Sequence, residues 1–265
     1  MHEPPVNTVE RWAWDFILGT SLAGKRQPPP VPEAWEENTP ARRIRAPGRP
    51  PELRIVKKAG KTRGLHAPSG RARALHTFFH HEMQAAELMA WALLAFPETP
   101  VEFRRGLIRI ALDEVRHMGL YAREIARLGY HVGDFTVRDW FWERIPSASD
   151  PASFVAAMGL GLEGANLEHS AAFARHFREA GDEACAQVQD VVGREEIAHV
   201  RFGVHWFQVF TGSLTFDSWR LALPKPLSPV LMRGRDLERE ARMRAGMSQQ
   251  FLDELEAWQP DTPGY

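Results

Sequence analysis

Two short stretches of the sequence decide the fold, Asp113-Glu114-Val115-Arg116-His117 and Glu195-Glu196-Ile197-Ala198-His199. Each contains a Glu-x-x-His motif, and residues three apart share one face of a helix. The motifs lie in phase with the apolar stripes of residues 100–128 and 182–210, so each predicts a carboxylate and an imidazole that point into a helical core. One such motif occurs by chance in many helices, whereas two on core faces form a specific pattern.

Each motif has a partner glutamate on the helical pattern that precedes it. Residues 74–96 carry a core stripe interrupted by Glu82, and residues 152–180 carry one interrupted by Glu163. Glu82 precedes Glu114 by 32 residues and Glu163 precedes Glu196 by 33, which indicates two copies of one helical hairpin. Two tight hairpins joined by one long crossover, between the second and third helices, predict an all-α four-helix bundle.

The predicted core holds more ionisable groups than an apolar interior tolerates without a counter-charge. Burying several unpaired carboxylates costs many kcal/mol in total, because each isolated buried charge is costly. Two divalent cations would neutralise four carboxylates, and each cation would receive one imidazole. Carboxylate-rich sites with one histidine per metal suit iron or manganese better than structural zinc. The predicted metal ligands are Glu82, Glu114, His117, Glu163, Glu196 and His199; the alternative is that these are surface pairs on solvated helices.

Further acidic residues compete for roles near this site. Glu87 and Glu168 lie five residues after Glu82 and Glu163 and are the alternative ligands if the helical register differs. Asp113 and Glu195 directly precede the ligand glutamates of the two motifs. Each of these two either orients a ligand histidine through a hydrogen bond or is an ordinary acid on a helix flank.

Two residues one turn beyond the predicted ligands have an open interpretation. Tyr121 follows His117 and is a candidate catalytic redox residue, with aromatic core packing as the alternative. Gly203 follows His199 and either opens space for oxygen or substrate or permits two helices to pack closely.

Charge is unevenly distributed along the 265 residues. Residues 41–75 contain eleven basic residues and one acidic residue, which gives about +10, so the rest of a chain with net charge −1 carries about −11. The single Cys185 excludes a disulfide framework and a cysteine-rich metal site. No signal-peptide pattern is apparent, and the apolar run 89–96 is far shorter than a membrane span. A cytoplasmic protein with no membrane partner is therefore expected.

The chain divides by character into three expected parts. Residues 1–73 form a short helix at 8–22, with Thr8 as N-cap, and then a Pro-rich and basic wrapping segment with a weak strand pattern at 53–56. Residues 74–212 form the bundle, and a short helix is expected at 140–144 in the crossover. Residues 213–265 form a C-terminal extension with short helices, including 235–245 and 248–258.

At the motif residues the chain resembles the ferritin-like di-iron carboxylate superfamily. Its motifs are similar to those of bacterial hydrocarbon monooxygenases, acyl desaturases, ribonucleotide reductase small subunits and rubrerythrins. Together with residues 80–88 (HHEMQAAEL), they more closely resemble an uncharacterised bacterial ferritin-like domain family allied to the di-iron enzyme that hydroxylates a modified tRNA adenosine. The resemblance implies two bound iron ions, with manganese possible, and it implies no particular substrate.

The leading functional interpretation is an O2-dependent di-iron oxidase or monooxygenase, with O2 as co-substrate. Electrons would come from an external donor, because the chain shows no dinucleotide fingerprint and no cysteine cluster. An iron-handling protein of ferroxidase or peroxidase type is the second interpretation. The third is an RNA-modifying hydroxylase whose basic segment 42–73 contacts phosphates; its candidate residues are Arg42, Arg43, Lys57, Lys58, Lys61 and Arg63. A monomer or homodimer is expected.

Overall fold

The computed structural model describes residues 2–58 and 64–260. The chain divides into two compact units, Met1–Pro146 and Ser147–Tyr265. Within the described ranges the secondary structure is helical apart from one isolated bridge between Ile55 and Val137, which confirms the predicted all-α class. The expected division at residues 73 and 212 stays a prediction.

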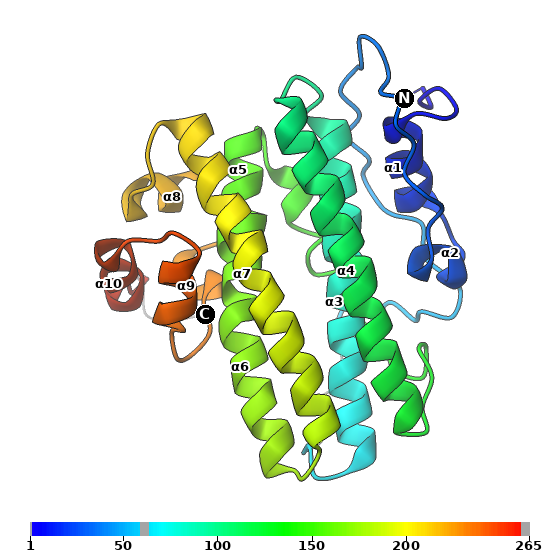
Figure 1. Cartoon of the computed structure of the whole chain (residues 1–265), viewed down its shortest axis with the longest axis vertical. Helices are drawn as coiled ribbons and strands as arrows, with labels where there is room; N and C mark the ends of the chain where they lie inside the picture. The colour runs from blue at the N-terminus through cyan, green and yellow to red at the C-terminus, as the bar shows by residue number, and fades with distance from the viewer. Residues whose placement is uncertain (1, 59–63, 261–265) are drawn as a thin grey trace. The chain divides into compact units, whose positions relative to one another are not determined.

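The first unit is built on a helical hairpin of α3 (Pro68–Ala95) and α4 (Val101–Arg127), which run side by side (Figure 1). Pro68 occupies the first turn of α3, where a missing N–H costs no hydrogen bond. From Glu82 to Phe96 every residue of α3 and its C-cap is buried. The predicted helices 74–96 and 100–128 are therefore confirmed, and α3 begins six residues earlier than expected.

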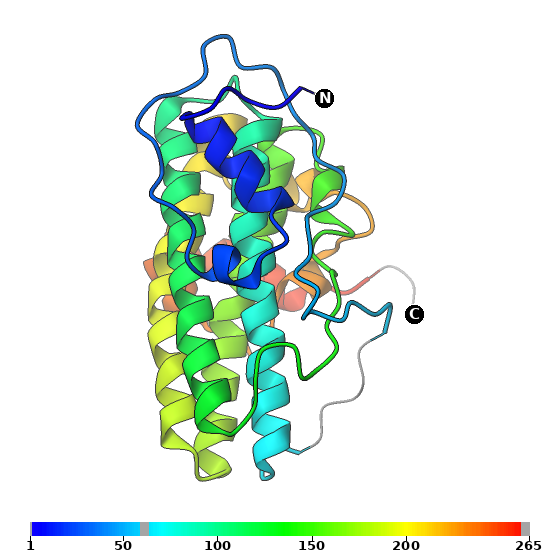
Figure 2. The same cartoon turned by 90° about the vertical axis from the view of Figure 1, so that its right-hand side faces the viewer.

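The N-terminal segment covers the α3–α4 hairpin (Figure 2). It contains α1 (Val9–Leu18) and α2 (Leu22–Arg26), where one helix over 8–22 was predicted. The Thr8 side chain accepts a hydrogen bond from the backbone N–H of Arg11, so the predicted N-cap is confirmed. A second cap at Ser21 accepts from Gly24 N–H and starts α2 as a separate helix.

The extended part of this segment is fixed to α3 by hydrogen bonds that its backbone donates and accepts. Arg42 N–H donates to the carbonyl of Leu94 at 2.7 Å, and the Trp91 indole donates to the carbonyl of Ile44 at 3.0 Å. The predicted strand at 53–56 amounts to the single bridge to Val137, with Val56 N–H bonded to its carbonyl at 2.8 Å. Residues 140–144 form turns that lead into a 3₁₀ helix (Ile145–Ser147) instead of the short helix expected there.

The second unit is built on a hairpin of its own. Its first arm is continuous: α5 (Pro151–Val155), a π-helical segment (Ala156–Leu162) and α6 (Glu163–Glu179). Its second arm is α7 (Glu183–Thr211), which packs along α6. The predicted helices 152–180 and 182–210 match these arms, and the π-helical segment was not predicted. Gly212 ends α7 at φ +85°, a left-handed conformation that glycine adopts at little cost.

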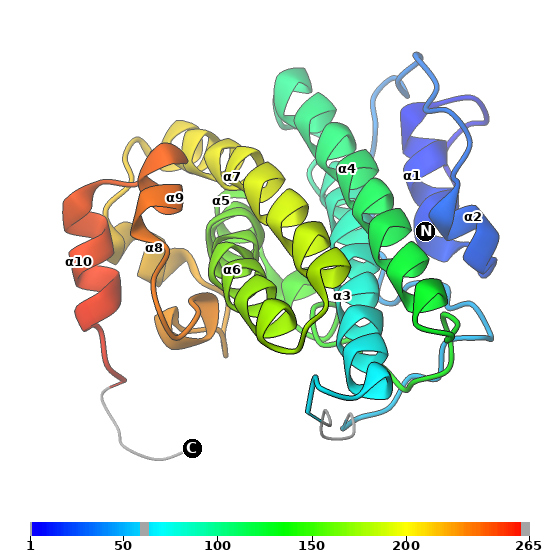
Figure 3. The ribbon, with the colours of Figure 1, turned by 60° about the horizontal axis from the view of Figure 1, so that its bottom comes forward.

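Short helices follow α7 and pack within the second unit (Figure 3). They are α8 (Phe216–Ala222), a 3₁₀ turn (Pro229–Met232), α9 (Arg239–Arg244) and α10 (Gln249–Ala257). The last two correspond to the predicted helices 235–245 and 248–258. Within the described ranges, none of the helices combines the length and the apolarity that crossing a bilayer requires.

Candidate metal centre

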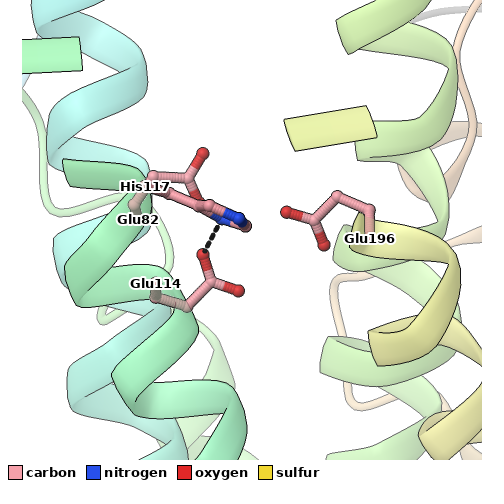
Figure 4. A group of neighbouring side chains, drawn as sticks. All are labelled: Glu82, Glu114, His117 and Glu196. Carbon is pink, nitrogen blue, oxygen red and sulfur yellow. Dashed lines mark hydrogen bonds and ion pairs between the residues drawn. The ribbon is translucent and has the colours of Figure 1, made fainter. Parts of the chain in front are cut away.

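The first unit places one glutamate of α3 beside the Glu-x-x-His motif of α4. Glu82, Glu114 and His117 are buried, with side chains at most 4% exposed. Each offers one ligand atom, and these three atoms lie within 4.8 Å of one another. The imidazole Nδ1 of His117 is 3.1 Å from Oε2 of Glu114, the contact that the dashed line marks in Figure 4. We call these three residues the first trio.

The second unit repeats the arrangement with the equivalent residues. Glu163 is the first residue of α6, and Glu196 and His199 lie on α7. All three are buried, and one ligand atom from each lies within 4.8 Å of the others. His199 Nδ1 is 3.0 Å from Oε2 of Glu196, nearly the distance found in the first trio. We call these residues the second trio.

The second trio has a neighbour that the sequence reasoning missed. The side-chain amide of Asn166 donates to Oε1 of Glu196 at 3.1 Å. Asn166 lies three residues after Glu163, so the two side chains share a face of α6. The equivalent position in the first unit is Ala85, three residues after Glu82, which has no hydrogen-bonding side chain. The Glu-x-x-Asn spacing could have indicated this contact.

Each trio offers two carboxylates and one imidazole in a buried environment, a donor set that fits a metal ion. Two carboxylates within 4.8 Å of each other repel when both are ionised. A bound divalent cation removes this repulsion. A ligand set of several oxygens and one nitrogen suits iron and manganese. The chemistry of the donors thus fits the metal ions that the sequence predicts.

Residues 15–253 match a family model described as "Protein of unknown function (DUF455)". The chain belongs to this DUF455 family. It is also 27% identical over 211 residues to an "Uncharacterized protein" of Haemophilus influenzae, an alignment that covers 76% of this chain and 73% of that protein. No solved structure matches the chain.

In this DUF455 chain, the first alternative ligand, Glu87, is held by cations. Its carboxylate accepts from Lys25 Nζ at 2.8 Å and from Arg49 at 2.7 Å, and the Trp142 indole donates to it at 2.8 Å. Lys25 also donates to the carbonyls of Phe16 and Ile17 at the end of α1. Burial lowers the pKa of Lys25 although Glu87 lies beside it. These contacts account for the charge of Glu87 without a metal.

The ion pairs around Glu87 continue to the crossover. Arg49 Nε bonds to Asp139 at 2.9 Å, and His80 Nε2 is 2.9 Å from the same carboxylate. Burial raises the pKa of Asp139, but hydrogen bonds from His80 and Arg49 outweigh it, so the pKa lies below its ordinary value. One turn earlier on α3, burial lowers the pKa of His76 to about 4, and its Nε2 accepts from Gly133 N–H at 2.7 Å.

The second alternative ligand, Glu168, is held by the C-terminal segment. Arg242 of α9 donates to both carboxylate oxygens, at 2.7 and 2.8 Å. The backbone N–H groups of Gly234 and Glu238 donate to the same carboxylate at 2.9 and 3.1 Å. Glu87 and Glu168 are thus equivalent in sequence and similar in environment, and this favours Glu82 and Glu163 as the ligands of the DUF455 chain.

The remaining candidates near the trios have distinct surroundings. Asp113 is half-exposed, and one of its oxygens lies 3.6 Å from Arg116. Glu195 is partly exposed on α7, so orientation of a histidine by either acid stays a prediction. Tyr121 is buried, with its ring 5.7 Å from the ring of Phe78; its redox role also stays a prediction. Gly203 packs against the backbone of Gly159. This contact agrees with the alternative in which Gly203 permits two helices to pack closely.

Several of the basic residues predicted to contact RNA have partners inside the first unit. Arg42 is buried and forms a bidentate ion pair with Glu36 at 2.6 and 2.7 Å. The guanidinium of Arg43 lies over the rings of Trp91 and Phe96. Lys57 and Lys58 are exposed, and Lys61 and Arg63 lie outside the described residues. The described part of this segment thus uses much of its charge for internal contacts.

Proposed function

We propose that this DUF455 protein is a ferritin-like di-iron carboxylate protein that catalyses an O2-dependent oxidation, with manganese as the alternative metal. The observation that carries the proposal is the repetition of one buried trio, Glu plus Glu-x-x-His, on two helical hairpins. Two such trios supply four carboxylates and two imidazoles, the ligand set of di-iron helical bundles.

The proposal requires the two hairpins to form one four-helix bundle with the trios facing each other. Glu82, Glu114 and His117 would then bind one metal ion, and Glu163, Glu196 and His199 the other. The connectivity supports this pairing, because each hairpin has a short turn and residues 128–150 form the long connection between them. Bound iron would supply the chemistry of O2 activation, which protein side chains lack.

The protein's own residues would hold the ligands and keep water away. The core stripe of α4 surrounds its ligands with Phe103, Leu107, Ile110, Met118 and Ile125, all buried. Asn166 fixes the orientation of Glu196 through its hydrogen bond. Cations bind Glu87 and Glu168, so these carboxylates do not compete for the metal. The result is a set of six oriented ligands in an apolar environment.

Metal stoichiometry tests the site. Protein loaded anaerobically with Fe(II) and then desalted is expected to hold about two metal ions per chain by elemental analysis. Glu114→Ala and His199→Ala are expected to lose most of this metal because each removes a ligand. Glu102→Ala on α4 and His205→Ala on α7 are matched controls at exposed positions of the same helices, and both are expected to retain it. Unchanged metal in a folded ligand variant would exclude the site.

Oxygen consumption separates the enzyme from an iron-handling protein. An oxidase is expected to oxidise about two Fe(II) per chain and then stop until an external reductant is supplied. Continuous oxidation of many Fe(II) per chain into a ferric core would contradict the enzymatic proposal while leaving the metal site intact.

A further inference from the structure

The outer face of α4 carries a row of exposed arginines that the metal site does not use. The row consists of Arg105, Arg109, Arg116, Arg123 and Arg127. At 100° per residue all five side chains fall within about 40° of one another around the helix, and at 1.5 Å per residue the row is roughly 33 Å long. We call it the arginine row. The exposed Leu112 lies within it.

The positive charge of the row is only partly neutralised. Arg116 is 3.6 Å from Asp113, and Arg127 is 2.5 Å from Glu124. Among the described residues, no carboxylate forms an ion pair with Arg105, Arg109 or Arg123. Aligned like charges that face solvent create a positive potential, which attracts an acidic partner and accelerates its association.

The row lies behind the metal-ligand face of the same helix. Glu114 follows Arg105 by nine residues, which is about 180° around a helix. Arg105 is exposed and Glu114 fully buried, as expected of opposite faces. A molecule bound to the row is therefore separated from Glu114 by about one helix diameter, roughly 10 Å.

We propose that the arginine row docks an acidic redox protein that donates electrons to the metal site; this inference rests on the proposed function. One turnover of an O2-dependent hydroxylation consumes two electrons and two protons, with one oxygen atom entering the substrate and the other leaving as water. A one-electron carrier supplies the electrons in two encounters and is oxidised by one electron in each.

Geometry and charge favour an acidic redox protein over a nucleic acid or a second copy of the chain as the partner of the arginine row. An electron crosses a helix, whereas a nucleic-acid substrate bound to the row could not bring a reacting atom to ligands on the opposite face. The row also contains no aromatic side chain for base stacking. A second copy bound symmetrically through the row would place arginine against arginine, which is repulsive.

A charge-reversed variant tests the proposal. The full chain is loaded with iron, and its reduction by a reduced plant-type [2Fe–2S] ferredoxin, an acidic one-electron carrier, is followed by stopped-flow absorbance at several salt concentrations. The variant R105E/R109E/R123E changes only exposed arginines that form no ion pair with described residues. The control R26E/R45E/R235E changes three exposed arginines elsewhere and alters the net charge equally. Photoreduced deazariboflavin, a small neutral reductant, reports whether each iron site accepts electrons.

The row variant is expected to be reduced by ferredoxin about 10-fold more slowly or worse, with a weaker salt dependence. The control variant is expected to behave like the wild type, and deazariboflavin to reduce all three equally. Equal ferredoxin rates in the row variant and the wild type would overturn the proposal. So would a wild type that accepts electrons from deazariboflavin but not from ferredoxin.

Two other outcomes have separate meanings. A chain that binds no iron overturns the proposed function and, with it, the docking proposal that rests on it. Binding of a short duplex RNA that is lost in the row variant and kept in the control, with ferredoxin reduction unchanged, would assign the row to nucleic acid instead.

Discussion

The residues around each buried glutamate distinguish the proposed metal ligands from the carboxylates that pair with arginine or lysine. Glu82 and Glu87 lie on one helix, yet Glu82 lies beside Glu114 and His117, whereas Glu87 accepts hydrogen bonds from Lys25 and Arg49. The second unit repeats the contrast, because Arg242 binds Glu168. A carboxylate already neutralised by arginine or lysine gains little from a metal cation, which is the reason for proposing Glu82 and Glu163 as ligands and not Glu87 and Glu168.

A single substitution tests whether Asn166 orients Glu196. Asn166→Ala removes the hydrogen bond to Glu196 and is expected to weaken metal binding by about 10-fold or more, as loss of a ligand-orienting contact typically does. Competition with a chromophoric chelator measures the affinity. Gln187→Ala, at an exposed position of α7, is the matched control, and equal affinity in both variants would show that Asn166 does not orient the ligand.

The motif residues were predictable because their signal is local. A Glu-x-x-His in phase with an apolar stripe needs only one helix, and the structure buries both motifs. The helical stripe led to the prediction of Glu82 over Glu87, but periodicity is a weak guide here because α3 is buried on all sides from Glu82 onward. The partners of Glu87, Lys25 and Arg49, could not be predicted, because they come from a distant segment that no periodic pattern connects to Glu87.

At the scale of elements, the first arm of the second hairpin departs from a regular helix just before Glu163, a proposed metal ligand. The N–H of Glu163 donates to the carbonyl of Met158, five residues earlier, at the end of the π-helical segment. Such segments shift the direction of the following side chains by one residue and occur frequently at functional sites. Sequence patterns located both ends of this arm, but residues 156–161 are apolar and buried, so their pattern did not reveal the inserted residue.

Close packing within the second unit gives a prediction at Gly203, for which Gly119 of the first unit is the control. A Cβ on Gly203 would lie 2.8 Å from the backbone carbon of Gly159, so Gly203→Ala is expected to lower the free energy of unfolding by about 1–3 kcal/mol. Gly119→Ala in α4 meets no atom within 4 Å and is expected to raise it by up to about 1 kcal/mol. Urea denaturation measures both, and a neutral Gly203→Ala would contradict the close contact.

At the scale of the whole molecule, a metal centre shared by two hairpins would couple two compact units. Metal that binds only the folded state stabilises it, by about 4 kcal/mol at a free concentration 1,000 times the dissociation constant. Chelation is therefore expected to lower the melting temperature and to speed hydrogen exchange in both α3–α4 and α6–α7, with α10 as an internal reference. Hydrogen-exchange mass spectrometry measures this, and a change confined to one hairpin would contradict a shared centre.

The three buried ion pairs of Glu87 and Glu168 also limit how far the chain can be shortened. Lys25 and Arg49 precede the predicted bundle 74–212, and Arg242 follows it. A chain trimmed to those residues would retain two deeply buried carboxylates and lose the cations that pair with them among the described residues. Removing one partner of a buried pair commonly costs about 3–5 kcal/mol. The flanking segments thus act as built-in counterions, and the four long helices are expected to be stable only with both ends attached.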